Sequence, residues 1–125
     1  MQFDSTRPIW LQVMHELEVS IVSGARQPGD KLPGGRDLAL AYGINPNTAV
    51  RVYQELEKSG LCETRRGMGT FVTRDPARVA ALREEMALQA VDGFLKQLGA
   101  LGISREEAAQ MILKEERKTC WKARK

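Results

Sequence analysis

Apolar side chains recur every third or fourth position early in the chain, as they do along one face of an α-helix. The spacing predicts an amphipathic helix over residues 8–23, ended by Gly24. Pro8 suits its first position, because the N–H that proline lacks would have no intrahelical partner there. Beyond a turn, residues 31–33 are expected to be extended.

Two further helices follow at short distance. One is predicted over residues 35–42, and the next is expected to begin after Asn45, its N-cap, and to close at Gly60. Only Gly43, Ile44 and Asn45 separate the two. Two helices joined by such a short turn containing glycine are typical of a helix-turn-helix.

The helical period stops after the third helix. Residues 61–65 and 70–73 predict two short strands. Between them, Gly67 and Gly69 can supply the positive φ angles that a tight hairpin needs. A hairpin directly after the second helix of a helix-turn-helix is a wing.

The last third of the chain returns to a helical pattern. A long helix is predicted from Asp75-Pro76 to about Leu98, and residues 99–102 break it. Residues 104–107 form a capping box that opens a last helix, expected to reach about Lys118. The predicted fold class is α+β and mainly α: a winged helix-turn-helix in residues 1–75, then a short two-helix C-terminal dimerisation unit in residues 76–125, which ends in a basic tail.

Length and composition narrow the classes of function. The chain has 125 residues, 42% apolar and 28% charged, which is typical of one small soluble domain with an appendage. It has no apolar run long enough to span a bilayer and no apolar signal core at its start, so we expect a cytoplasmic protein without membrane contact. Its two cysteines lie far apart and it has one histidine, which predicts neither a metal site nor a cofactor. No nucleophile with a base, carboxylate pair or phosphate loop appears at convincing spacing, so an enzyme is not expected.

The order of these motifs resembles the GntR family of bacterial transcription regulators, and the Asn-Pro-Asn-Thr stretch and short C-terminal part resemble its YtrA-like subfamily. The resemblance covers about residues 8–73. The stretches that carry it are residues 8–10, 27–33, 36–39, 43–48, 53–57, 60–61 and 65–72. It implies a homodimeric regulator, expected to be a repressor, that binds double-stranded operator DNA on an inverted repeat.

Candidate DNA contacts lie on the third helix and the wing. Asn47, Thr48 and Arg51 share the polar side of the third helix, where asparagine can read adenine and arginine can read guanine. Arg66 at the wing tip can enter a minor groove, and Gly67 lets the backbone approach DNA. The resemblance adds Arg36, which matches a family position that contacts operator DNA. The predicted DNA-binding residues are Arg36, Asn45, Asn47, Thr48, Arg51, Arg65, Arg66 and Gly67.

Several of these residues also have simpler interpretations, and the chain departs from the family pattern. Asn47 and Thr48 could serve only as capping residues, and Arg36 could pair with a carboxylate. Many family members carry arginine where this chain has Pro46 and Val50, so their guanine readout does not transfer. A further departure is Gly34-Gly35, which stands where the family usually places a serine cap before the second helix.

Charge does not itself indicate DNA binding by the winged domain. Residues 1–75 carry nine basic and nine acidic side chains, and the net charge of +3 comes from residues 76–125. Part of that charge lies in a C-terminal tail that also contains Trp121. We expect this tail to be solvated or, alternatively, to contact DNA without specificity. The basic residues of this tail are Lys118, Lys122, Arg124 and Lys125.

The two C-terminal helices carry more apolar side chains than they can bury against each other. Packing against the winged domain is one explanation, and burial in a homodimer is the one we favour. The predicted dimerisation residues are Leu82, Met86, Ala90, Phe94, Leu98, Met111 and Ile112. A small-molecule effector could bind at the dimer interface, although the sequence does not indicate which ligand it would be. The alternative function is a winged module for protein–protein contact or for nonspecific nucleoid binding.

Overall fold

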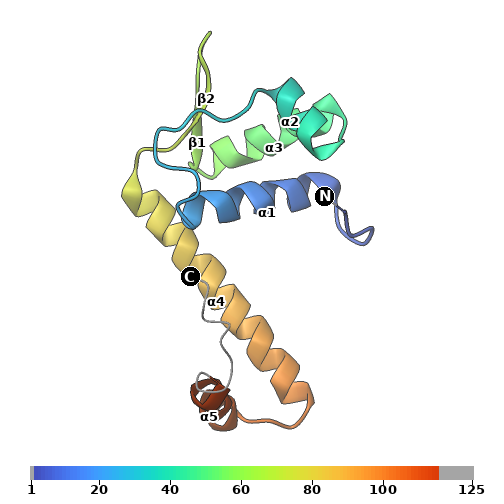
Figure 1. Cartoon of the computed structure of the whole chain (residues 1–125), viewed down its shortest axis with the longest axis vertical. Coiled ribbons are helices and arrows are strands. Elements are labelled where there is room, and N and C mark those ends of the chain that lie inside the picture. Colours follow the sequence, from blue (N-terminus) through green and yellow to red (C-terminus); the bar gives the residue numbers. More distant parts are fainter. Residues whose placement is uncertain (1, 116–125) are drawn as a thin grey trace. The chain divides into compact units, whose positions relative to one another are not determined.

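The computed structural model describes residues 2–115 of the 125. Within them the chain forms five helices and a two-stranded sheet (Figure 1). Residues up to Glu84 make one compact unit, here the N-terminal unit, and the described residues from Glu85 onward make the C-terminal unit. The elements are, in order, α1 (Ile9–Val22), α2 (Gly35–Tyr42), α3 (Pro46–Lys58), β1 (Cys62–Arg65), β2 (Gly69–Val72), α4 (Pro76–Ala100) and α5 (Arg105–Glu115).

The core of the N-terminal unit is built where α1 and α2 pack against α3. The apolar positions that predicted these helices are the ones that the fold buries, so the amphipathic pattern is confirmed. They include Val13, Leu17 and Ile21 of α1, Leu38 of α2, and Ala49, Val52 and Leu56 of α3. Burial of these side chains leaves the opposite face of α3 open to solvent.

α1 begins one residue later than the sequence predicts. Pro8 has a ψ of 140°, an extended value, and is the N-cap rather than the first helical residue. The cause is Gln12, whose buried side chain donates hydrogen bonds to the carbonyls of Asp4 and Arg7 at 2.7 and 3.0 Å. These bonds hold the residues before Pro8 in a turn against the helix.

The turn between α2 and α3 has the predicted chemistry. Gly43 adopts a left-handed φ of 65°, and the N–H of Ile44 donates to the carbonyl of Ala39 at 2.9 Å, which closes α2. Asn45 is the N-cap of α3, and its Oδ1 accepts from the N–H of Asn47 at 2.7 Å. The helix-turn-helix is therefore fixed by local hydrogen bonds.

The wing is attached to the rest of the unit through β2. β1 and β2 pair antiparallel, with Cys62 opposite Val72. On its other side, β2 bonds to the extended segment before α2: Leu32 N–H donates to the Thr70 carbonyl, and Val72 N–H to the Asp30 carbonyl, both at 2.8 Å. The predicted extended segment thus fixes the wing relative to the start of α2.

The first turns of α4 belong to the N-terminal unit. The side chain of Asp75 caps the helix, with Oδ1 accepting from the N–H of Ala77 at 3.0 Å. Nε of Arg78 donates to the carbonyl of Ser59, the C-cap of α3. Leu82 is buried in this unit. The compact unit consequently extends past residue 75.

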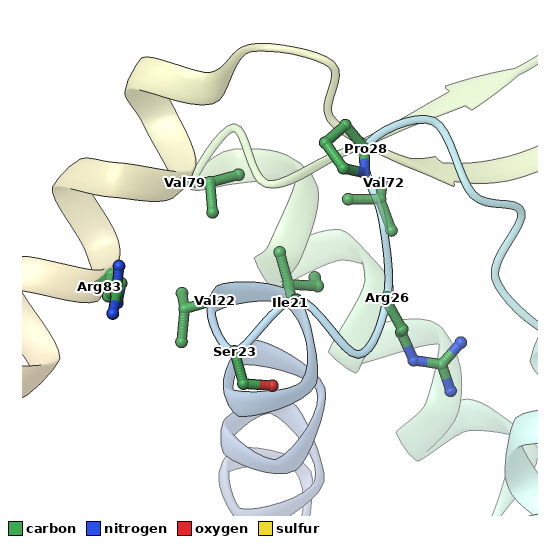
Figure 2. A pocket seen from close by; sticks show the side chains of 9 residues that line it. Ile21, Val22, Ser23, Arg26, Pro28, Val72, Val79 and Arg83 are labelled. Carbon is green, nitrogen blue, oxygen red and sulfur yellow. The ribbon is translucent and has the colours of Figure 1, made fainter. Parts of the chain in front are cut away.

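A small cavity lies beside this start of α4 (Figure 2). Ile21 and Val22 at the end of α1 face Val79 across it, and Pro28 and Val72 close another side. Its charged lining residues are Arg26 and Arg83, and Arg26 points away from the apolar side chains.

The C-terminal unit is a pair of helices joined by a short turn. Gly102, with a φ of 82°, makes the turn, and the capping box before α5 forms as predicted. Ser104 Oγ accepts from the N–H of Glu107 at 3.1 Å, and the Glu107 carboxylate accepts from the N–H of Ser104 at 2.9 Å. The predicted end of the last helix near Lys118 and the basic tail lie outside the described residues. None of the helices in residues 2–115 is long and apolar enough to cross a membrane.

Candidate nucleic-acid interface

The start of α3 presents polar groups to solvent. Asn47 is exposed and Thr48 is half-buried, one turn before the buried Val52. Asn45 is exposed as well, but its side-chain oxygen is occupied by the cap to Asn47. Asn45 therefore has its amide nitrogen left as a donor toward an external partner.

The outward face of α3 contains two residues that the sequence analysis did not select. Val50 is 48% exposed, and Gln54 is exposed one turn further on. Both lie away from the buried Ala49 and Val52, so the helical period that identified the core could also have found them. Gln54 has the side-chain type that can make a bidentate contact with adenine.

Arg51, on the same face, is held by two neighbours. Its Nε lies 3.9 Å from a carboxylate oxygen of Glu55, one turn later on α3. Its guanidinium carbon lies 4.2 Å from the ring centroid of Trp10, on the first turn of α1. Its side chain nevertheless remains 55% exposed. This arginine is oriented without being buried.

The wing tip carries the other candidate cations. Arg66, Gly67 and Met68 are exposed at the turn, which is closed by a hydrogen bond of 2.9 Å from the Met68 N–H to the Arg65 carbonyl. Arg65 lies over the Phe71 ring at 4.4 Å and 3.8 Å from the Glu63 carboxylate. Arg65 is thus held against the strands, whereas Arg66 lies at the exposed turn.

An open hollow separates the wing from the start of α2. Gly34 and Gly35 line one side of it, and Thr64, Gly67 and Thr70 line the other. Gly69 has a φ of 120°, a backbone conformation that favours glycine, and a Cβ there would also lie 2.8 Å from Cε of the flexible Lys31 side chain. Arg36 is exposed on the first turn of α2. The hollow brings the start of α2 near the cationic side chains of Lys31 and Arg65, and the carboxylate of Asp37 lines it as well.

Two buried ionisable groups lie behind this surface. The hydroxyl of Tyr53 on α3 donates to the carbonyl of Pro33, and burial raises the pKa of Tyr53 to about 12. Burial likewise raises the pKa of Cys62 to about 12. Both groups stay protonated at neutral pH, so the side of α3 that faces the wing carries no charge from them.

The described residues contain no cluster of metal ligands. Residues 2–115 hold no group of three or more histidine, cysteine or carboxylate side chains that could bind an ion. His15 lies near a carboxylate of α1, with Nδ1 4.0 Å from an oxygen of Glu18.

The predicted dimerisation residues fall into two groups. Leu82 is buried and lies within the residues of the N-terminal unit. The others lie in the C-terminal unit and are exposed or half-exposed: Met86, Ala90, Phe94, Leu98, Met111 and Ile112. Among residues 85–114, Ala108 alone is buried.

Comparison with known proteins identifies this arrangement. Residues 10–72, from α1 to the end of the wing, match the family of bacterial regulatory proteins named for gntR. The chain belongs to the GntR family. It is 40% identical over 111 residues to the uncharacterized regulator YhcF of Bacillus subtilis, covering 89% of this chain and 92% of YhcF. It is 37% identical over 94 residues to the transcriptional repressor YtrA of the same organism, covering 75% of this chain and 70% of YtrA, and it falls in the YtrA-like subfamily.

Solved structures of GntR-family proteins share the fold. A GntR-family regulator from Listeria monocytogenes matches 90% of this chain and 98% of its own, with a TM-score of 0.83 and 36% identity. The DNA-binding domain of AraR, solved in complex with its operator, matches 58% of this chain and 89% of its own, with a TM-score of 0.53 and 27% identity. The predicted fold class is therefore confirmed, and the chain is a DNA-binding transcriptional regulator and not an enzyme.

Proposed function

We propose that this GntR-family regulator is a repressor that binds an inverted-repeat operator as a homodimer. The observation that carries the proposal is the uncovered apolar surface of the C-terminal unit. A helix pair that buries Ala108 alone among residues 85–114 lacks the apolar burial that stabilises helices in water. A second copy of the same unit would supply that burial with two-fold symmetry.

The dimer interface is proposed to lie on α4 and α5. Phe94 is 39% exposed, Met111 49% and Ile112 55%, and such large apolar side chains rarely gather on the surface of a monomer. Met86, Ala90 and Leu98 of α4 complete the set. Leu82 is left out because the N-terminal unit already buries it.

Base recognition is proposed for α3. Asn47 and Arg51 lie on its exposed N-terminal half, which in a helix-turn-helix enters the major groove. Gln54 extends that face by one turn. Thr48 and the amide of Asn45, next to the first N–H groups of the helix, are better placed for phosphate.

The remaining contacts are proposed for the wing and for α2. Arg66 would enter the minor groove, with Gly67 allowing the backbone to approach closely. Arg65, already held by Phe71 and Glu63, and Arg36 on the first turn of α2 would contact phosphates. Repression itself is supported by the similarity to YtrA, which is named a repressor.

Selection of binding sites from a random pool of duplex DNA, with the full chain, tests this proposal. The expected result is an inverted repeat whose affinity exceeds that of random DNA by about 10³-fold or more. Flat affinity across sequences would instead indicate nonspecific nucleoid binding, and a lone asymmetric site would argue against a dimer. Placing the selected repeat across a promoter in a reporter then shows whether the protein represses or activates transcription. We expect lower transcription, and a rise would contradict repression.

A further inference from the structure

The contact between Trp10 and Arg51 joins two helices at the edge of the proposed reading face. The residues are far apart in sequence, yet the guanidinium lies 4.2 Å from the indole ring centroid. At this distance the positive charge is attracted to the π-electrons of the ring face. Glu55 is the second neighbour of Arg51, with its carboxylate oxygen 3.9 Å from the Arg51 Nε.

These two contacts order the Arg51 side chain and still leave it able to bind a base. The ion pair engages Nε, whereas a bidentate contact to guanine can use the two terminal nitrogens. The contact with the ring and the ion pair together restrain the guanidinium, and a side chain that is already ordered loses less entropy when it binds. The 55% exposure of Arg51 leaves it accessible to a ligand.

Trp10 does not belong to the buried stripe of its own helix. The buried residues of α1 are Gln12, Val13, Leu17 and Ile21, whereas Trp10 is half-buried on the first turn. The hydrogen bonds of Gln12 to residues 4 and 7 fix that turn. The ring of Trp10 is therefore presented from a fixed helix start.

We propose that Trp10 is a positioning residue for base recognition, which holds the Arg51 guanidinium in the orientation that reads a guanine. The inference rests on the proposed function of Arg51 and adds a residue that itself does not touch DNA. It assigns a role in sequence discrimination to a side chain on α1, outside the helix-turn-helix.

The test measures base preference position by position, using the sites selected by the wild-type chain and full-length variants. Arg51→Ala should reduce discrimination at one base pair of each half-site by about 5- to 150-fold. Trp10→Leu should reduce it at the same base pair by about 2- to 5-fold, since an exposed cation–π contact is of that size. Trp10→Phe, which keeps a ring face, should retain most of the preference. The double variant Trp10→Leu/Arg51→Ala should discriminate no worse than Arg51→Ala alone.

Controls separate positioning from folding. Val19→Ala removes an exposed apolar side chain from the same helix and should leave base preference unchanged. Thermal unfolding of every variant shows whether a loss of base preference is caused by a loss of stability instead. The contact is also visible without DNA: in a Trp121→Phe background, Arg51→Ala should change the emission of Trp10.

The outcomes distinguish this inference from the proposed function. If Arg51→Ala loses the preference and Trp10→Leu keeps it, Trp10 has no positioning role although the reading function stands. A uniform loss on all sequences in Trp10→Leu, or tighter binding, would also overturn the inference. If Trp10→Leu does not fold, unchanged Trp10 emission on removal of Arg51 overturns it. If the wild-type chain selects no site, the proposed function fails and the inference fails with it.

Discussion

The arginines of the candidate interface differ in what surrounds them. Arg51 and Arg65 each have an aromatic ring and a carboxylate as neighbours, so their guanidinium groups are oriented in the free protein. Arg36 and Arg66 are exposed at a helix start and at a hairpin turn. An oriented guanidinium suits a base or a fixed phosphate, whereas an exposed one suits the backbone of DNA in varied geometry.

At this scale, Arg66→Ala should weaken binding to all sequences by a similar factor. The log–log slope of affinity against salt should fall by about 1, since one cation is removed from the DNA interface. Arg66→Lys, which keeps the charge, should preserve most of the slope. Titrations at several salt concentrations measure both variants, and an unchanged slope in Arg66→Ala would show that the wing tip does not touch DNA.

Cys62 gives a prediction about pH. Burial raises its pKa from 9.0 to about 12, so the folded state keeps the thiol protonated while the unfolded state ionises first. Its contribution to stability is therefore complete below about pH 9 and falls as pH rises toward 12. Denaturant unfolding at pH 8 and pH 10.5 should show a smaller loss in Cys62→Ala than in the parent chain. Equal losses would mean that this thiol does not cause the pH dependence.

At the scale of the element, the start of α3 combines Asn45, which caps the helix, with Asn47, which is proposed to contact DNA. Asn45→Ala removes the cap to the Asn47 N–H and should cost about 1 kcal/mol of stability. Asn47→Ala leaves that cap intact and should weaken DNA binding with little change in stability. Thermal unfolding and DNA titration of both variants check this. A stability loss in Asn47→Ala as large as in Asn45→Ala would contradict the division.

The sequence predicts best those elements whose ends are set by residues close by in the chain. Gly43, with Asn45 and Pro46, specified the turn and the start of α3, because its left-handed φ and the side-chain cap require these residue types nearby. The start of α1 was misplaced by one residue because Gln12 reaches back to residues before the helix.

Contacts between segments far apart in the sequence cannot be predicted from these local patterns. The pairing of β2 with residues 30–32 and the stacking of Arg51 on Trp10 depend on how helices and strands pack. Periodicity placed Arg51 on the polar face but gave no sign of its neighbours. The same periodicity places Gln54 on the exposed face of α3, about one turn after Val50.

At the scale of the whole molecule, the chain divides into a unit that carries the proposed DNA-reading face and a unit whose helix pair buries few side chains. The compact N-terminal unit extends to Glu84, with Arg78 and Leu82 packed into it. A fragment that retains the fold should therefore end after residue 84 rather than after residue 75. The C-terminal unit has no comparable core in residues 85–114, so we expect its stability to depend on protein concentration through dimerisation.

The most direct test of the account is the ratio of affinities for a full inverted repeat and a single half-site, measured for the intact chain and for residues 1–84. Linking two reading heads makes the second contact intramolecular, which raises avidity by about 10²–10⁴-fold. We predict a ratio of that size for the intact chain, and for the fragment a ratio near that of independent binding. Equal ratios for the two proteins would contradict a reading head dimerised through α4 and α5.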